Sequence, residues 1–121
     1  MKQMNWKKKF SQGKELIFST ASKDGKPNSI IVISMGFMND KLMVNNCQMN
    51  STIKNLQENN HVCVIGGYIR LRGFASIHRD DDIHSEGCRR ETDYEVKDTI
   101  LIDVTEVVDL DSQTLIFQVQ R

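Results

Sequence analysis

The stretch from Tyr68 to His78 alternates between two kinds of side chain with a period of two, and it constrains the fold more than any other segment. One face would carry Ile69, Leu71, Gly73, Ala75 and Ile77, and the other Arg70, Arg72, Phe74 and Ser76. Successive side chains of a strand point to opposite faces of a sheet. The pattern therefore predicts a strand with one buried face.

Shorter apolar and β-branched segments, bounded by turn-forming residues, predict the other strands. They span residues 15–22, 28–36, 41–46, 61–65, 99–108 and 113–119. The continuous apolar run within 28–36 predicts a strand covered on both faces, and Asp24-Gly25 before it predicts a tight hairpin turn. Helices are expected only over 2–13, for about two turns after Asn50, and around 83–90. Tight turns between mostly antiparallel strands predict a mainly β fold, a closed or nearly closed barrel of six to seven strands.

Length, charge and cysteine usage limit the class of protein. The 121 residues predict a single domain, 1–121, near the size at which pairing with a second copy adds useful burial. Acidic and basic side chains balance at 16 each, so neither nucleic acid nor a membrane is expected as a partner, and Lys7-Lys8-Lys9 is interpreted as a solvated face. The absence of an apolar spanning run or secretory signal, together with an odd number of cysteines, 3, predicts a cytoplasmic protein.

The segment 45–60 contains the first candidate site, where a strand leads into a short helix. Asn50 is the predicted N-cap, which places Ser51 and Thr52 in the first helical turn. Free backbone N–H groups, the helix dipole and two hydroxyls make such a turn suitable for an anion. Most caps of this kind bind only their own backbone, so the local pattern leaves a phosphate site and an ordinary cap both open.

Other chemical motifs are weaker. His78, His84 and Cys88 have a spacing that suggests metal ligands, with acidic residues nearby. A closed structural zinc site needs four ligands in a recognisable pairing, so we interpret this segment as a charged surface loop and predict no metal. The sequence predicts no glycine-rich phosphate loop, no Ser-His-Asp arrangement and no metalloprotease motif.

Several segments taken in order resemble a known family. They are a Ser-Thr-Ala-Ser strand, a Lys-Asp-Gly-Lys-Pro turn, the segment Met-Asn-Ser-Thr-Ile-Lys-Asn-Leu-Gln-Glu-Asn, and Arg72-Gly73-Phe74-Ala75. Over about residues 10–110 the chain resembles the pyridoxamine 5'-phosphate oxidase-like FMN-binding split barrels, which include general stress proteins and nitroimidazole-resistance proteins.

The resemblance implies a homodimer with two FMN sites at the subunit interface. It implies that the flavin ring lies against the strand at Ile33, Ser34 and Met35, and that the ribityl chain passes Asn45, Asn46 and Cys47. It implies that the phosphate lies at Asn50, Ser51 and Thr52, with Lys54 one turn further along.

The chain also departs from the family pattern. Ser51 stands where family members usually have a lysine, and Ile31 and Gly36 stand near the arginine and lysine positions of the oxidase. Neutral donors bind a phosphate dianion more weakly than charged ones, unless Lys54, Arg70 or Arg72 compensates. We therefore do not expect true pyridoxamine phosphate oxidase activity.

The expected function is that of an FMN-dependent oxidoreductase, which passes electrons from a donor such as NAD(P)H to an unknown acceptor. Two alternatives stay open. One is a non-catalytic domain that binds a flavin, F420 or another small ligand. The other is a haem-binding split barrel, which would use His61, His78 or His84.

Overall fold

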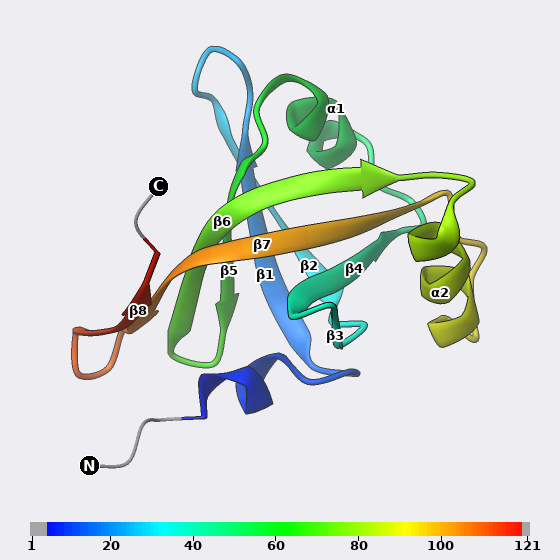
Figure 1. The fold of residues 1–121 in the computed structure, drawn as a ribbon. Coiled ribbons are helices and arrows are strands. Elements are labelled where there is room, and N and C mark those ends of the chain that lie inside the picture. The colour runs from blue at the N-terminus through cyan, green and yellow to red at the C-terminus, as the bar shows by residue number, and fades with distance from the viewer. Residues whose placement is uncertain (1–4, 120–121) are drawn as a thin grey trace.

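The structure, a computed structural model that describes residues 5–119, contains one eight-stranded antiparallel sheet wrapped into a split barrel (Figure 1). The strands are β1 (Glu15–Ala21), β2 (Pro27–Ile33), β3 (Phe37–Met38), β4 (Lys41–Asn46), β5 (His61–Gly66), β6 (Ile69–His78), β7 (Asp98–Asp109) and β8 (Thr114–Gln118). The helices are a 3-10 helix, η1 (Trp6–Phe10), and two α-helices, α1 (Ser51–Glu58) and α2 (Asp82–Arg90). The predicted mainly β split barrel is confirmed.

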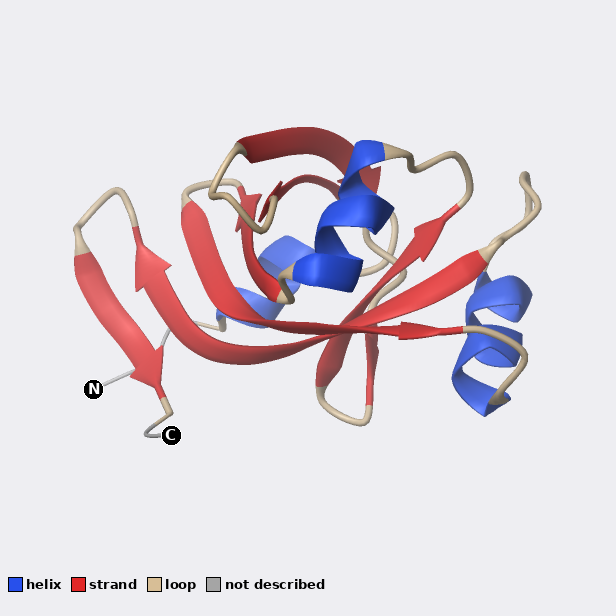
Figure 2. Cartoon of the chain, turned by 90° about the horizontal axis from the view of Figure 1, so that it is seen from above, coloured by secondary structure: helices blue, strands red, loops and turns tan. Residues whose placement is uncertain are grey.

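The sheet follows the order β2-β1-β5-β6-β7-β4-β3. The long strand β7 pairs with β4 along its first half and with β8 along its second, so β8 extends away from the barrel (Figure 2). The barrel closes just beyond β2, where Met35 N–H donates to the Met43 carbonyl at 2.9 Å and Met43 N–H donates to the Gly36 carbonyl at 2.8 Å. This closure fixes the end of β2 beside β4.

The predicted alternation of β6 is confirmed, because its residues 69, 71, 73 and 75 are buried. A bulge between Arg72 and Gly73 shifts the register against β7. A Cβ atom at Gly73 would lie 2.2 Å from the Asp103 carbonyl oxygen, so only glycine allows β7 to approach this closely. Because Arg72 pairs with Glu106 and Gly73 with Val104, the extra residue is Thr105 of β7, and the bulge bends β7 around the barrel.

Apolar side chains fill the barrel, with η1 at one end and α1 at the other (Figure 1). Phe10 from η1 is fully buried, and Leu56 from α1 is 6% exposed. The strands contribute Leu16, Phe18, Val32, Leu42, Val44, Val62, Val64, Ile69, Leu71, Ala75, Ile100, Ile102, Val104 and Val107.

Two local predictions differ from the structure. Strand β3, only two residues long, lies where a turn was predicted, and it raises the number of strands to eight. The N-terminal helix is a five-residue 3-10 helix that ends at Phe10, short of the predicted end at residue 13, and residues 1–4 lie outside the described part. In the range 5–119, no helix is long and apolar enough to cross a membrane.

The largest difference concerns β2. Its continuous apolar run predicted cover on both faces, but Val32 is buried while Ile31 and Ile33 are 64% and 43% exposed. The strand therefore alternates like a surface strand, with isoleucines on its outer face. Isolated apolar side chains on a surface are common, but here they form the floor of a groove.

Candidate functional site

A groove with a volume of about 520 Å³ runs along the outer face of β2. Residues of β2 and Met35 form its floor, and the segment after β4 forms one wall with the start of α1. The end of α2 and the residues that follow it form the other wall. The lining residues are Gln12, Gly13, Ile30, Ile31, Val32, Ile33, Met35, Asn45, Cys47, Gln48, Met49, Thr52, Arg90, Glu91, Thr92, Asp93 and Tyr94.

The first turn of α1 lies beside the start of β2. Thr52 lines the groove although it is only 1% exposed, and its hydroxyl accepts a hydrogen bond from Asn28 Nδ2 at 3.1 Å. Asn50 occupies the N-cap position but makes no capping hydrogen bond through its side chain. The first N–H groups of a helix have no partner within the helix, so those of α1 can bind an anion.

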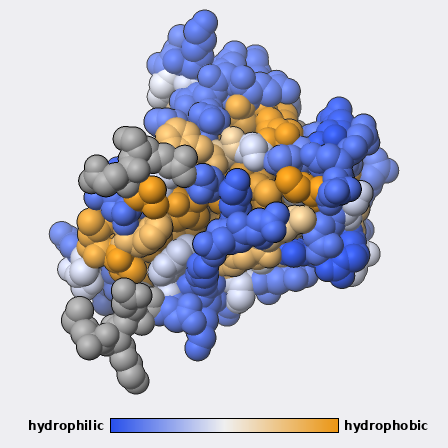
Figure 3. All heavy atoms as spheres, in the orientation of Figure 1, coloured by the Kyte–Doolittle hydropathy of each residue, from blue (hydrophilic) through white to orange (hydrophobic). Residues whose placement is uncertain are grey.

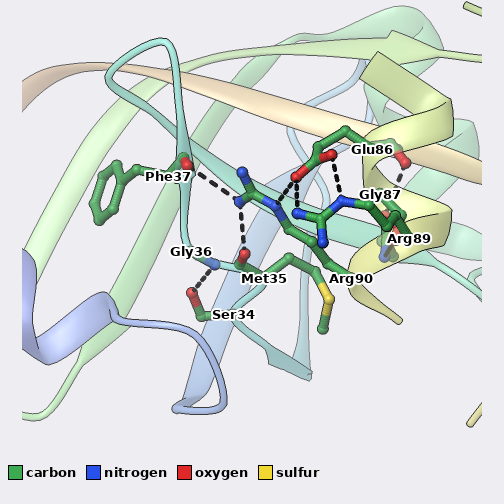
Figure 4. A network of polar contacts seen from close by, with 10 residues as sticks. Ser34, Met35, Gly36, Phe37, Glu86, Gly87, Arg89 and Arg90 are labelled. Carbon is green, nitrogen blue, oxygen red and sulfur yellow. Dashed lines mark hydrogen bonds and ion pairs between the residues drawn. The ribbon is translucent and has the colours of Figure 1, made fainter. Parts of the chain in front are cut away.

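Arg90 lies at the other end of β2, beside the segment that contains Met35 and Phe37 (Figure 4). Its Nη1 donates to the carbonyls of Met35 at 2.9 Å and Phe37 at 3.1 Å, and its Nε donates to Glu86 at 2.7 Å. Hydrogen bonds from Arg89 and then from Arg90 lower the pKa of Glu86 to about 2. The carboxylate therefore stays ionised and holds Arg90 in place, so the groove contains a positioned guanidinium.

Gly87 allows α2 to dock where Arg90 reaches the groove. A Cβ atom at position 87 would lie 2.0 Å from Thr99 Oγ1 and 2.6 Å from Asn45 Oδ1. Asn45 Nδ2 instead donates to the Gly87 carbonyl at 3.0 Å, while Thr99 Oγ1 donates to Asn45 Oδ1 at 2.8 Å. Both ends of the Asn45 amide are thus used to attach α2 to the barrel.

The structure brings half of the predicted site residues into the groove. Those that line it are Ile33, Met35, Asn45, Cys47 and Thr52, and those outside its lining are Ser34, Asn46, Asn50, Ser51 and Lys54.

Two of the residues outside the lining are buried and have internal partners. Ser34 Oγ donates to the Phe10 carbonyl at 2.6 Å, and Asn46 Nδ2 donates to Asp98 at 2.8 Å. Asn50, Ser51 and Lys54 are exposed at the start of α1. The cations suggested as substitutes, Arg70 and Arg72, lie on β6 beside Glu106, outside the groove lining.

Sequence reasoning missed the wall formed by Arg90 and residues 91–94. This segment was predicted to be a charged loop with a short helix, and nothing in its local pattern shows that it faces β2. The Asn45 and Gly87 contacts that place it join residues distant in the sequence.

The cysteine and histidines near the site are not arranged for catalysis or metal binding in the groove. Burial, then the charges of Glu91 and Cys88, raise the pKa of the Cys47 thiol, which keeps it protonated. None of the three histidines lines the groove. No group of three metal-ligating side chains is found between residues 5 and 119.

These features define a small ligand-binding split barrel. The family described as pyridoxamine 5'-phosphate oxidase matches residues 7–119, so the chain belongs to this family. A search of curated proteins finds no match.

Solved structures share the fold at low identity. HupZ of Group A Streptococcus has a TM-score of 0.78 at 18% identity, over 95% of this chain and 98% of that one. General Stress Protein 26 of Bacillus anthracis has a TM-score of 0.69 at 21% identity, over 96% and 100%. A pyridoxamine 5'-phosphate oxidase-related, FMN binding protein of Nostoc punctiforme has a TM-score of 0.57 at 14% identity, over 78% and 72%.

Proposed function

We propose that the groove along β2 binds FMN. The observation that carries this proposal is the pair of exposed isoleucines, Ile31 and Ile33, on the floor of a groove of ligand size. Exposed apolar side chains gain free energy when a flat apolar ring covers them. A ligand with an apolar ring, a polar edge and an anionic end matches this lining.

The residues present fit such a group in three places. Ile31, Ile33 and Met35 offer the ring an apolar floor. Arg90 offers a cation toward polar or negative atoms at the ring edge. The uncapped first turn of α1, with Thr52, offers N–H and hydroxyl donors to a phosphate. Because these donors are neutral, we expect weaker phosphate binding than a lysine or arginine would give.

We propose that the protein is an FMN-dependent oxidoreductase. When bound, FMN supplies the transfer of electrons from a reductant such as NAD(P)H to an acceptor. The chain's contribution is to bind and orient the ring, and Arg90 would favour negative charge at the ring edge. A ligand carrier without turnover is the competing outcome.

We further propose that a second copy covers this face. In the sheet Ile31 pairs with Ile17 of β1, which is 40% exposed, so apolar surface continues from the groove onto the next strand. A homodimer would bury this surface and close the open side of the groove. The 3 free cysteines are consistent with a cytoplasmic location, where thiols stay reduced.

Titration of the purified protein with FMN, followed by flavin fluorescence, tests the proposal. Ile31→Asp should weaken binding at least about tenfold, since it loses apolar burial and adds a charge near an anionic ligand. Leu115→Asp is the matched control, because Leu115 is 52% exposed on β8, where apolar side chains gather away from the groove (Figure 3). Equal affinity of wild type and Ile31→Asp would refute the site.

Turnover is tested separately. Oxidation of NAD(P)H by the FMN-loaded protein, faster than by free FMN, would support an oxidoreductase. FMN binding without this acceleration would identify a carrier.

A further inference from the structure

Three side chains form a hydrogen-bonded chain at the end of β6, where β6 leads into α2. Ser76 Oγ lies 2.7 Å from His78 Nε2, and His78 Nδ1 lies 2.9 Å from Asp81 Oδ2. The hydroxyl, the two imidazole nitrogens and the carboxylate occur in the order found in serine hydrolases. The sequence predicted no such arrangement.

Local geometry explains why these residues meet. Ser76 and His78 are two residues apart on a strand, so their side chains emerge on the same face. The chain then reverses through Asp80, whose φ of 59° lies in the left-handed region that aspartate tolerates. This turn brings Asp81, the N-cap of α2, back beside the His78 ring.

The position of Asp81 determines which nitrogen of His78 carries the proton. Its Oδ1 accepts the N–H of His84 at 2.8 Å, and its Oδ2 faces His78 Nδ1. The hydrogen bond from His84 N–H, followed by that from His78, lowers the pKa of Asp81. An ionised carboxylate can only accept, so in the neutral ring Nδ1 carries the proton. The Nε2 lone pair then accepts the proton of Ser76 Oγ.

This hydroxyl is open to solvent and lies outside the β2 groove. Ser76 is exposed, and none of the three residues lines the groove. The hydrogen-bonded group of Ser76, His78 and Asp81 is therefore separate from the proposed flavin site. A hydroxyl that donates to a fixed imidazole acceptor is an activated nucleophile.

We propose that Ser76 accepts acyl groups from small activated esters and thioesters, with His78 as its general base and Asp81 as a positioning residue. Ser76 Oγ forms a bond to the carbonyl carbon as its proton passes to His78 Nε2. The bond from that carbon to the leaving oxygen or sulfur breaks, and the leaving group takes the proton from His78. The products are an ester at Ser76 and a free alcohol, phenol or thiol.

The test uses a fluorophosphonate probe, in which fluoride is displaced from phosphorus by the same attack, and locates the adduct by mass spectrometry. We expect labelling at Ser76, its loss in Ser76→Ala, and a drop of at least about tenfold in His78→Gln. Stoichiometric release of nitrophenol from p-nitrophenyl acetate should follow the same pattern.

Ser29 provides an internal control, since its exposed hydroxyl lies 2.8 Å from Ser19 Oγ and has a hydroxyl neighbour instead of imidazole. The proposal is overturned if Ser76 is unlabelled, if Ser29 is labelled at the same rate, or if His78→Gln labels like wild type.

The variant Asp81→Asn distinguishes the contact of Asp81 with His78 from its role as the N-cap of α2. Asparagine is an equally good N-cap, so this substitution should preserve α2. Nitrogen NMR of the His78 ring should show a proton on Nδ1 in the wild type and a changed tautomer in Asp81→Asn, with slower labelling. An unchanged tautomer and labelling rate in this variant would refute the role of Asp81.

Discussion

Replacing Gly87 by alanine tests how α2 is attached to the barrel, and two physical effects predict opposite signs. In a helix interior alanine is favoured over glycine by about 1 kcal/mol, so propensity alone predicts stabilisation. The added Cβ, however, would lie 2.0 Å from Thr99 Oγ1 and 2.6 Å from Asn45 Oδ1. These atoms are hydrogen-bonded to each other at 2.8 Å, so neither can move without losing a contact.

We expect the steric effect to dominate. Overpacking of this kind costs about 1–3 kcal/mol, and loss of a side-chain hydrogen bond adds about 1 kcal/mol. After the gain in propensity, the free energy of unfolding should fall by about 1–3 kcal/mol. In a chain of this size that lowers Tm by roughly 3–5 °C for each kcal/mol. Because Arg90 lies three residues further along α2, FMN affinity should fall as well.

Urea denaturation and FMN titration of Gly87→Ala measure both effects. Ser85→Ala, at an exposed position of the same helix, is the matched control and should leave both nearly unchanged. A Gly87→Ala protein more stable than wild type would show that α2 does not dock through the Asn45 and Thr99 contacts.

Three further predictions concern the two ends of the groove. Joint replacement of Ser51 and Thr52 by alanine should weaken FMN binding by about 1–3 kcal/mol in a titration, the scale for hydrogen bonds to a charged group, and unchanged affinity would place the phosphate elsewhere. Arg90→Met should lower the free energy of unfolding by about 2–4 kcal/mol in urea, because the Met35 and Phe37 carbonyls lose their donor; a stability equal to wild type would contradict those hydrogen bonds. Folding lowers the pKa of Glu86 from 4.5 to about 2, so its stabilisation is complete above pH 4.5 and is lost as the pH falls toward 2. In acid denaturation Glu86→Gln should therefore be less stable at neutral pH and should show a smaller loss over that range than wild type.

The strands of the fold could be predicted because their signals are local. The period of two in β6 and the turn after β1 depend on neighbouring residues, and both are found in the structure. The prediction for β2 was wrong. Four apolar residues in a row indicate a strand that is covered on both faces, whereas the side chains of Ile31 and Ile33 are exposed in the single chain. Their exposure marks the candidate site.

The site could be predicted only in part. The resemblance to the family placed Met35 at the flavin ring and Thr52 at the phosphate, and both residues line the groove. Arg90 could not be found, since its position depends on Gly87 meeting Asn45 across the fold. Ser76 and His78 are only two residues apart, so their contact depends on local geometry alone. Asp81 reaches the His78 ring only because the chain turns back at Asp80, which adopts a positive φ.

Mapping FMN binding by amide chemical shifts tests the central claim most directly. On addition of FMN to the labelled protein, the largest shifts should fall in residues 30–35, 51–53 and 90–94, which border the groove. Shifts confined to the outer face of β5 and β6, around His61 and Arg72, or no shifts with millimolar FMN, would contradict the groove as the flavin site.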